Sequence, residues 1–207
     1  MADRGCLIAF EGIEGAGKST QIRLTAAALR ARGVVVVETR EPGGTALGAE
    51  VRRLLMHSPE SQPTPLAELL LYLADRAQHV SQVIGPALAQ GKVVLTDRFS
   101  ASTIAYQGCA RRLDFETVTR LDAIARQGVA PGLTVLLDCP VEVGLARARG
   151  DDRFHREEQQ FHDRVRAGFL SLAREHWDGY CVIDATAPHE QVQEQVLAAV
   201  MQCLNLR

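Results

Sequence analysis

Eight consecutive residues near the N-terminus have the types and spacing that bind phosphate groups. They read Gly12-Ile13-Glu14-Gly15-Ala16-Gly17-Lys18-Ser19 and fit the pattern G-x-x-x-x-G-K-[ST]. Glycines let successive backbone N–H groups converge on phosphate oxygens, and the start of a following helix adds positive potential. In this motif the lysine reaches the β- and γ-phosphates of a nucleoside triphosphate, and the hydroxyl ligates Mg²⁺. We therefore expect a loop that binds a nucleoside triphosphate with Mg²⁺ from Gly12 to Thr20, with Lys18 on the phosphates and Ser19 on the metal.

The surroundings of this loop support that interpretation. Cys6 to Phe10 is a short apolar run, and Lys18 to Arg32 repeats apolar residues at helical spacing until Gly33 ends the pattern. The loop is therefore expected to join a strand to a helix, as the motif requires. The alternative is a glycine-rich turn without a ligand. It is disfavoured because a lysine buried in such a turn would be costly without an anion.

Two charged residues, Asp97 and Arg98, follow a second apolar run, Val93 to Thr96. A carboxylate at the end of a strand is well placed to hold Mg²⁺ through water, as in other P-loop enzymes. The alternative is that Asp97 caps the helical stretch that begins at Ser100. An arginine such as Arg98 is unusual directly after a helix-capping residue, whereas it is well suited to bind a phosphate.

The elements that must position these groups alternate between strands and helices. Uninterrupted apolar runs are typical of parallel strands covered on both faces. Besides Cys6 to Phe10, the sequence has three such runs: Val34 to Thr39, Val93 to Thr96 and Leu133 to Leu137. Val182 and Ile183 are expected to add a fifth strand. This order predicts an α/β fold with a five-stranded parallel sheet flanked by helices. Ligands in such folds gather beyond the carboxyl ends of the strands.

Helical patterns fill the segments between these strands. They are Leu47 to Met56, Pro65 to Gln90 with a kink at Pro86, Ser100 to Tyr106, Phe115 to Arg126, Val141 to Arg147, Glu157 to Glu175 and Glu190 to Leu204. No linker divides the chain, so residues 1–207 are expected to form one domain. The segment from Gly150 to Glu158 is charged and lacks an apolar run. We expect a mobile lid there, over about residues 148–158.

Charge and cysteine content argue against several classes of protein. The formal net charge is −2, from 23 basic and 25 acidic residues spread along the chain, so no basic face for nucleic acid or a membrane is expected. The 5 cysteines lie far apart without a CxxC pair, which argues against zinc and favours a reducing cytoplasm. No leader is recognisable, and no apolar run approaches the roughly 20 residues that span a bilayer. We expect a cytoplasmic protein with small-molecule partners.

Five short strings resemble bacterial thymidylate kinases, in the same order and over nearly the whole chain. They are Phe10-Glu11-Gly12-Ile13-Glu14-Gly15-Ala16-Gly17-Lys18-Ser19-Thr20, Thr39-Arg40-Glu41-Pro42-Gly43-Gly44-Thr45, Ala74-Asp75-Arg76-Ala77, Asp97-Arg98-Phe99 and Ala105-Tyr106-Gln107-Gly108. The resemblance implies a P-loop kinase fold and ATP- and Mg²⁺-dependent phosphorylation of dTMP to dTDP, by a homodimer. Alternatives are another nucleoside monophosphate kinase, a sugar or metabolite kinase, a GTPase switch or a nucleic-acid-binding module. A GTPase would need an N-K-x-D-like segment, and the sequence has none.

The resemblance also implies roles around the acceptor's phosphate and sugar. Arg98 would clamp the phosphate with help from Arg52, because guanidinium groups bind phosphate oxygens in pairs. Glu14 would lie near the sugar and the metal, and Glu41 would line the same pocket. Tyr106 would press against the sugar where a ribose carries its 2′-hydroxyl. No general base is expected, since the attacking phosphate oxygen is already ionised.

For the base, the resemblance implies an aromatic stack and several hydrogen bonds. Tyr72 would stack on the pyrimidine, and Arg76 would donate to a thymine carbonyl. Thr103 and Gln107 would reach the base edge. The alternative is that Tyr72 and Tyr106 are core aromatics and that Arg52 and Arg76 are solvated helix residues.

The family has two subtypes, which carry the catalytic arginine either in the phosphate loop or in the lid. The loop position here is Gly15, whereas Arg147, Arg149 and Arg153 crowd the lid. We therefore expect the lid type, with Arg153 the first candidate and Arg149 the second, acting with Lys18 and Arg98 on the transferred group.

The chain departs from the family's pattern at two places. His155 stands where the family usually has a glutamate, after Asp152-Arg153-Phe154. Cys109 and Ala110 stand where further glycine is usual after Gly108. The resemblance to the family is therefore weaker for the ordering of the lid than for the phosphate loop.

Overall fold

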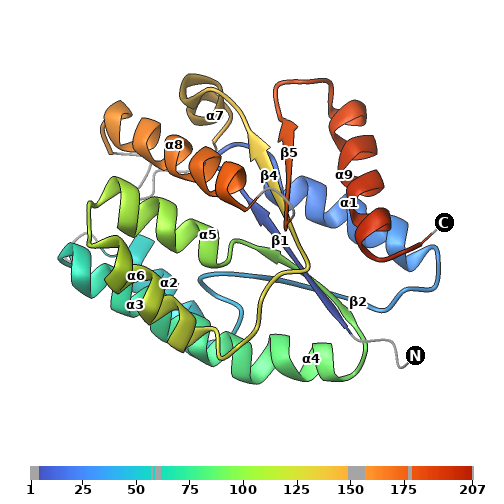
Figure 1. The fold of residues 1–207 in the computed structure, drawn as a ribbon, viewed down its shortest axis with the longest axis horizontal. Helices are drawn as coiled ribbons and strands as arrows, with labels where there is room; N and C mark the ends of the chain where they lie inside the picture. The colour runs from blue at the N-terminus through green and yellow to red at the C-terminus, as the bar shows by residue number, and fades with distance from the viewer. Residues whose placement is uncertain (1–4, 57, 59–61, 149–156, 177–178, 207) are drawn as a thin grey trace.

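A five-stranded parallel sheet forms the centre of the computed structural model, which describes residues 5–56, 58, 62–148, 157–176 and 179–206 (Figure 1). The strand order is β2-β3-β1-β4-β5, and every neighbouring pair is parallel. The bounds are β1 Cys6–Glu11, β2 Val36–Arg40, β3 Val93–Asp97, β4 Leu133–Asp138 and β5 Tyr180–Asp184. The expected α/β fold with a five-stranded parallel sheet is confirmed.

Helices cover both faces of this sheet (Figure 1). Their bounds are α1 Lys18–Arg30, α2 Ala46–Met56, α3 Pro65–His79, α4 Gly85–Ala89, α5 Ser100–Thr103, α6 Phe115–Ala125, α7 Val141–Arg147, α8 Gln159–Glu175 and α9 His189–Cys203. Helices α1 and α9 pack side by side on one face, and α3 packs against α6 on the other. None of the described helices is long and apolar enough to cross a membrane.

The central strands are buried, whereas the two edge strands are not. Ile8, Phe10 and Val135 on β1 and β4 have no exposed surface. The expectation that Val34 to Thr39 forms a strand covered on both faces is wrong, because β2 is an edge strand that begins at Val36, and only Val36 of its five residues is buried. Its backbone pairs on one side only, with β3, so fewer neighbouring elements cover its faces.

The helical stretch from Pro65 to Gln90 is divided by a π-helical turn rather than by a simple kink. Helix α3 ends at His79, the turn spans Val80–Ile84, and α4 follows. The Gly85 N–H bonds to the Val80 carbonyl, five residues earlier. The π turn therefore lies directly before Pro86, which has no N–H to continue the α-helical pattern. A second π turn, Ile104–Ala110, extends the helix expected to end at Tyr106.

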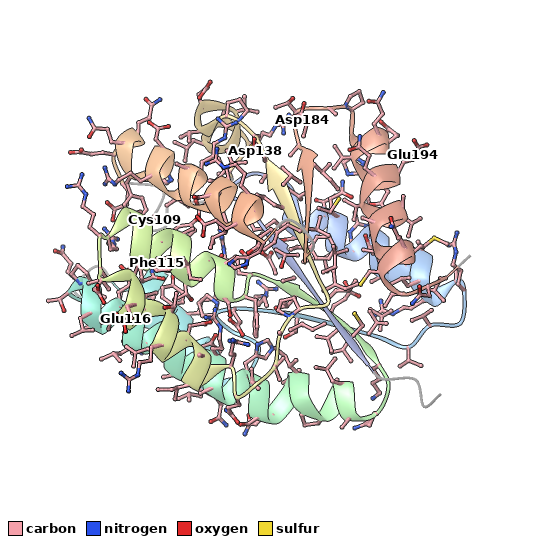
Figure 2. All side chains as sticks on the ribbon, viewed as in Figure 1. Cys109, Phe115, Glu116, Asp138, Asp184 and Glu194 are labelled. Carbon is pink, nitrogen blue, oxygen red and sulfur yellow. The ribbon has the colours of Figure 1, made fainter. Side chains whose placement is uncertain are left out.

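Three strands end in an aspartate at the carboxyl edge of the sheet: Asp97, Asp138 and Asp184. Figure 2 labels Asp138 and Asp184 at the ends of the neighbouring strands β4 and β5, where they are paired in register. Asp138 forms an ion pair with Arg166, and Asp184 accepts hydrogen bonds from Thr186. Asp97 is the strand-end carboxylate next to the phosphate loop, because its Oδ2 accepts a hydrogen bond from Ser19 at the start of α1.

Asp75 connects α3 to the loop between β2 and α2. Its Oδ1 accepts a hydrogen bond from the Gly43 N–H at 3.2 Å, and its Oδ2 has no hydrogen-bond partner among the described residues. Burial raises the pKa of this carboxyl to about 6, with a further contribution from the charge of Glu41. A Cβ at Gly48 would lie only 2.1 Å from Oδ1, so glycine allows α2 to pack directly on this carboxyl.

We predict that Asp75→Asn makes stability less dependent on pH. A folded-state pKa near 6, above the unfolded value near 4, means that the folded protein binds more protons between them, so stability falls as pH rises through this range. Urea unfolding should show that the wild type loses about 1 kcal/mol more than the variant between about pH 5 and about pH 7.5. Asp163→Asn, at an exposed position of α8, is the control. Parallel pH profiles for the wild type and Asp75→Asn would contradict the prediction.

Candidate active site

The phosphate loop lies between β1 and α1, at the carboxyl edge of the sheet, as predicted. Lys18 folds back into this loop and is only 7% exposed. Its Nζ donates to the Gly12 carbonyl at 3.1 Å and to the Ile13 carbonyl at 2.8 Å. Burial lowers the pKa of Lys18, and the charge of Arg98 lowers it further, while nearby carboxylates such as Asp97 oppose this shift. A buried cation held mainly by loop carbonyls can exchange them for phosphate oxygens.

The structure brings together the two residues expected to hold a metal. The Ser19 hydroxyl, at the start of α1, donates to Asp97 Oδ2 at 2.7 Å. Asp97 ends β3, which lies beside β1. Two oxygen ligands therefore meet at the mouth of the phosphate loop, and oxygen is the ligand atom that Mg²⁺ prefers.

Arg98 lies between the phosphate loop and the helices that follow β3. Its backbone has φ 75°, which is uncommon for a residue with a side chain. Its guanidinium donates to the Gly12 carbonyl at 3.0 Å, to Ser102 Oγ at 3.0 Å and to Glu14 Oε1 at 2.9 Å. Arg98 is thus held by the loop on one side and by α5 on the other.

Glu11, to which the sequence analysis assigned no role, holds the turn after Arg98. Its carboxylate is fully buried and accepts hydrogen bonds from the Phe99 N–H at 2.8 Å, the Ser102 N–H at 3.2 Å and the Ser102 hydroxyl at 2.6 Å. Burial raises the pKa of Glu11, although these bonds and Arg98 oppose the shift. An acidic residue at the last position of a buried strand was the signal that could have identified it.

Glu14 is the carboxylate of the phosphate loop. Burial would raise its pKa, but the charges of Arg98 and Lys18 and a hydrogen bond from Tyr106 outweigh burial, so the pKa is lowered. The Tyr106 hydroxyl lies 2.8 Å from Oε1 and 2.9 Å from Oε2. Glu14 is therefore ionised at neutral pH and orients both Arg98 and Tyr106.

A large cavity of about 630 Å³ opens in front of the phosphate loop. It is lined by loop residues, by five basic side chains, and by three acidic ones. The basic residues are Lys18, Arg40, Arg52, Arg98 and Arg147, and the acidic residues are Glu14, Glu41 and Asp97. The excess of basic side chains suits a ligand with several phosphates. Another cavity, of about 270 Å³, lies beside the loop and is lined by Gly15, Arg147, Ala185 and His189, among others.

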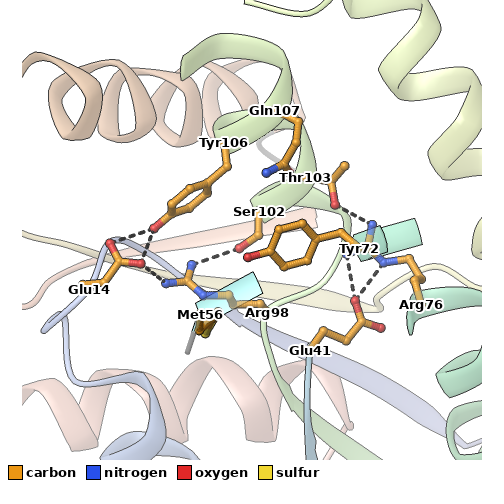
Figure 3. A pocket seen from close by; sticks show the side chains of 10 residues that line it. All are labelled: Glu14, Glu41, Met56, Tyr72, Arg76, Arg98, Ser102, Thr103, Tyr106 and Gln107. Carbon is orange, nitrogen blue, oxygen red and sulfur yellow. Dashed lines mark hydrogen bonds and ion pairs between the residues drawn. The ribbon is translucent and has the colours of Figure 1, made fainter. Parts of the chain in front are cut away.

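A narrow pocket of about 30 Å³ adjoins the large cavity (Figure 3). The residues that line it are Glu14, Glu41, Met56, Tyr72, Arg76, Arg98, Ser102, Thr103, Tyr106 and Gln107. In Figure 3 the Tyr72 ring lies across this pocket and points toward Ser102 and Arg98. All the residues expected around the acceptor therefore line this pocket, except Arg52, which lines the large cavity.

The residues expected to read the base are held by the protein itself. Arg76 is 2% exposed, and its guanidinium bonds to Glu41 Oε2 at 2.8 Å, to Thr103 Oγ1 at 2.7 Å and to Asp122. Burial would lower the pKa of Arg76, but the two carboxylates raise it on balance. Gln107 Nε2 donates to Glu68 Oε1 at 2.9 Å. The alternative of a solvated Arg76 is wrong, because this side chain is part of a buried network.

Tyr106 belongs both to the core and to the pocket. It is 5% exposed and packs edge-on against Phe161 and Phe169. The Arg98 guanidinium lies 5.1 Å from the centre of its ring. The two interpretations considered for Tyr106 are therefore compatible, since packing fixes the ring while the hydroxyl faces Glu14.

Some residues of the site were not anticipated, and others lie outside the described residues. Ser102 on α5 and Met56 at the end of α2 both line the pocket, and no spacing or motif in the sequence indicated either of them. Arg147 ends α7 and donates to the Ala185 carbonyl at 2.7 Å. The candidate arginines Arg149 and Arg153, with His155 and most of the expected lid, lie outside the described residues.

Known proteins resemble this chain over nearly its whole length. The thymidylate kinase family model matches residues 10–196. A thymidylate kinase of Geobacter sulfurreducens is 51% identical over 189 residues, which cover 87% of this chain and 89% of that protein. One of Trichlorobacter lovleyi is 47% identical over 203 residues, covering 94% and 96%.

A solved structure agrees with these relatives. The crystal structure of thymidylate kinase from Ehrlichia chaffeensis superposes with a TM-score of 0.79 at 33% identity, and the match covers 95% of this chain and 98% of that one. Fold, family model and relatives thus agree with the five ordered strings. The chain belongs to the thymidylate kinase family.

Proposed function

We propose that this protein transfers the γ-phosphoryl group of ATP to dTMP, giving dTDP and ADP. The observation that carries this proposal is that the large basic cavity and the narrow pocket share Arg98 and Glu14 in their walls. A triphosphate on the loop and a monophosphate in the pocket would therefore meet at Arg98. Membership of the thymidylate kinase family identifies the two substrates.

Catalysis in this arrangement rests on positioning and charge. An ionised oxygen of the acceptor's phosphate attacks the γ-phosphorus in line, and the bond to the bridging oxygen of ADP breaks. Lys18 exchanges its loop carbonyls for the β- and γ-phosphates. Arg98 turns from Glu14 and Gly12 toward the acceptor's phosphate, with Arg52 from α2 beside it. No side chain has to take up a proton.

Ser19 and Asp97 are the residues proposed to hold Mg²⁺. Their short contact places two oxygens at the mouth of the loop, and the described residues contain no group of three or more His, Cys, Asp or Glu side chains arranged to hold a metal ion. This sparse set fits Mg²⁺, which usually keeps several waters and binds phosphates together with one or two protein ligands. When bound, the ion would neutralise charge on the β- and γ-phosphates.

The acceptor's nucleoside is proposed to bind in the narrow pocket. Because the Tyr72 ring lies across this pocket, it must swing aside and stack on the pyrimidine. Arg76, Thr103 and Gln107 form the wall that reads the base edge, and Glu41 fixes Arg76 in place. Tyr106 and Glu14 flank the sugar.

We predict that dTMP is the preferred acceptor in a coupled ADP-release assay across nucleoside monophosphates. Faster turnover of AMP, GMP or CMP would refute the assignment in favour of another monophosphate kinase.

Lys18→Ala should abolish measurable transfer in the same assay, because the lysine supplies charge at the triphosphate. Lys92→Ala, which changes the other lysine of the chain, is the matched control and should retain activity. Near-normal activity of Lys18→Ala would refute the role of the loop.

An arginine of the segment after α7 is proposed to stabilise the transferring phosphoryl group. The loop itself cannot supply one at Gly15, because a Cβ there would lie 1.9 Å from the Gly144 carbonyl oxygen and the backbone has φ +72°. The charge must therefore come from elsewhere, and the sequence offers Arg153 and Arg149.

Arg153→Ala should lower turnover at least about a hundredfold with little change in acceptor affinity, since such an arginine contributes about 10³ to 10⁵ in other P-loop enzymes. Steady-state kinetics with Arg153→Ala and Arg149→Ala, beside Arg174→Ala on α8 as the control, would measure this. Losses below about threefold in both lid variants would exclude the mechanism, because they are too small for this role.

A homodimer is proposed from the exposed apolar side chains on α2 and α3. Leu66 and Leu70 lie one turn apart on α3 and are 51% and 49% exposed, and Leu47 on the adjacent α2 is 48% exposed. We infer that these exposed leucines, carried by two helices that pack together, contribute to a subunit interface.

Light scattering should give twice the chain mass of 22.5 kDa. Leu70→Glu should give the monomer mass, because it places a charge within the interface. Val35→Glu, which changes an exposed valine before β2, should leave the dimer intact. A wild-type monomer at micromolar concentration would contradict the proposal.

Two further proposals concern the whole chain. All 5 cysteines are free thiols, which supports a reducing cytoplasm as the location. We also propose that residues 1–207 form one thymidylate kinase-like domain, supported by the sheet that joins β1 near the N-terminus to β5 near the C-terminus.

A further inference from the structure

His162 is a fully buried histidine near the phosphate loop that none of the proposed steps uses. It lies on α8, has no exposed surface, and packs edge-on against Phe161 with ring centres 5.6 Å apart. Neither ring nitrogen has a hydrogen-bond partner among the described residues. A buried polar group without a partner is destabilising, so such a group in a native fold needs an explanation.

The hydrogen-bond acceptor that this imidazole faces is the carboxylate of Glu14. His162 Nδ1 lies 3.8 Å from Glu14 Oε2, which is too long for a hydrogen bond. Arg98 and Tyr106 both donate to Oε1, whereas Oε2 accepts from Tyr106. The carboxylate also accepts a hydrogen bond from its own backbone N–H. Three donor hydrogens therefore meet the roughly four lone-pair sites of the carboxylate, which leaves capacity for one more donor. A donor and an acceptor thus face each other in a buried site without being joined.

Acceptor binding would change the balance around Glu14. In the structure Arg98 neutralises this carboxylate at 2.9 Å. If Arg98 turns to the acceptor's phosphate, Glu14 loses its closest cation while it remains largely buried. A buried carboxylate that loses one partner needs another donor, or it becomes costly to keep ionised.

We propose that His162 is a positioning residue for the transfer reaction, and that its Nδ1–H donates to Glu14 Oε2 when Arg98 moves to the acceptor's phosphate. A shift of about 1 Å would bring the two atoms to hydrogen-bond distance. The bond keeps Glu14 aimed at the acceptor's sugar and at Tyr106, and no proton is transferred. This inference rests on the proposed dTMP kinase activity.

A purely structural role predicts a different outcome for substitution. If His162 only filled space, a leucine of similar volume would serve equally well in function. Because leucine also removes two unpaired polar atoms from the interior, His162→Leu should unfold at the same temperature as the wild type or higher. Activity and stability are therefore expected to change in different directions, which loss of packing cannot explain.

The experiment compares three variants by steady-state kinetics and thermal unfolding. His162→Leu removes the donor, His162→Asn keeps an N–H near the position of Nδ1, and His162→Gln moves it toward Nε2. We expect His162→Leu and His162→Gln to lower kcat/KM for dTMP about tenfold, the effect of one hydrogen bond to a charged group. The KM for ATP should stay unchanged, and His162→Asn should remain within about threefold of the wild type. Val165→Ala, one turn along α8, controls for lost packing.

A double-mutant cycle with Glu14→Gln tests the partner. In that background His162→Leu should have little further effect on kcat/KM for dTMP, because the ionised carboxylate that accepts the hydrogen bond is gone. The inference is overturned if His162→Leu keeps wild-type kinetics with dTMP, or if the two losses multiply independently. Should His162→Leu fail to fold, equal activities of the Asn and Gln variants overturn it instead. A wild type inactive toward dTMP would refute the proposed function, whereas normal wild-type activity with an unaffected His162→Leu would refute only this inference.

Discussion

The buried carboxylate of Glu11 is the interaction on which the rest of the site depends. It receives the Phe99 and Ser102 N–H groups and the Ser102 hydroxyl, and so ties the turn after β3 to the end of β1. That turn contains Arg98, whose φ of 75° is unfavourable for a side-chain-bearing residue. The three hydrogen bonds offset this strain. They therefore determine that the guanidinium stands at the boundary between the two cavities.

The charges of the site are balanced within the protein before any ligand binds. Arg98 is paired with Glu14, Arg76 with Glu41 and Asp122, and Lys18 with loop carbonyls. These pairs differ in depth. Arg76 and both of its partners are nearly fully buried, whereas Arg98 and Glu14 keep some exposure at the cavity wall. The deep network would be costly to break and suits a rigid wall, while the shallower pair can exchange partners with a phosphate.

Much of the candidate site was predictable because it follows local rules. The phosphate loop depends on glycines at fixed spacing between a strand and a helix, and each of these is visible in one continuous segment. Ser19 and Asp97, 78 positions apart, were also predicted to meet, because β1 and β3 end at the same edge of a parallel sheet. By contrast, His162 became a candidate only through its distance to Glu14, which no spacing along α8 encodes.

By itself the sequence determined the order of strands and helices, the phosphate loop and the family, because apolar periodicity and short motifs are properties of neighbouring residues. Only the tertiary structure decided that β2 is an edge strand, that Pro86 is preceded by a π turn, and that Arg76 is buried between two carboxylates. It also decided that Gly15 has no room for a side chain. These outcomes depend on which distant segments pack together, since burial and pairing arise from contacts across the fold rather than along the chain.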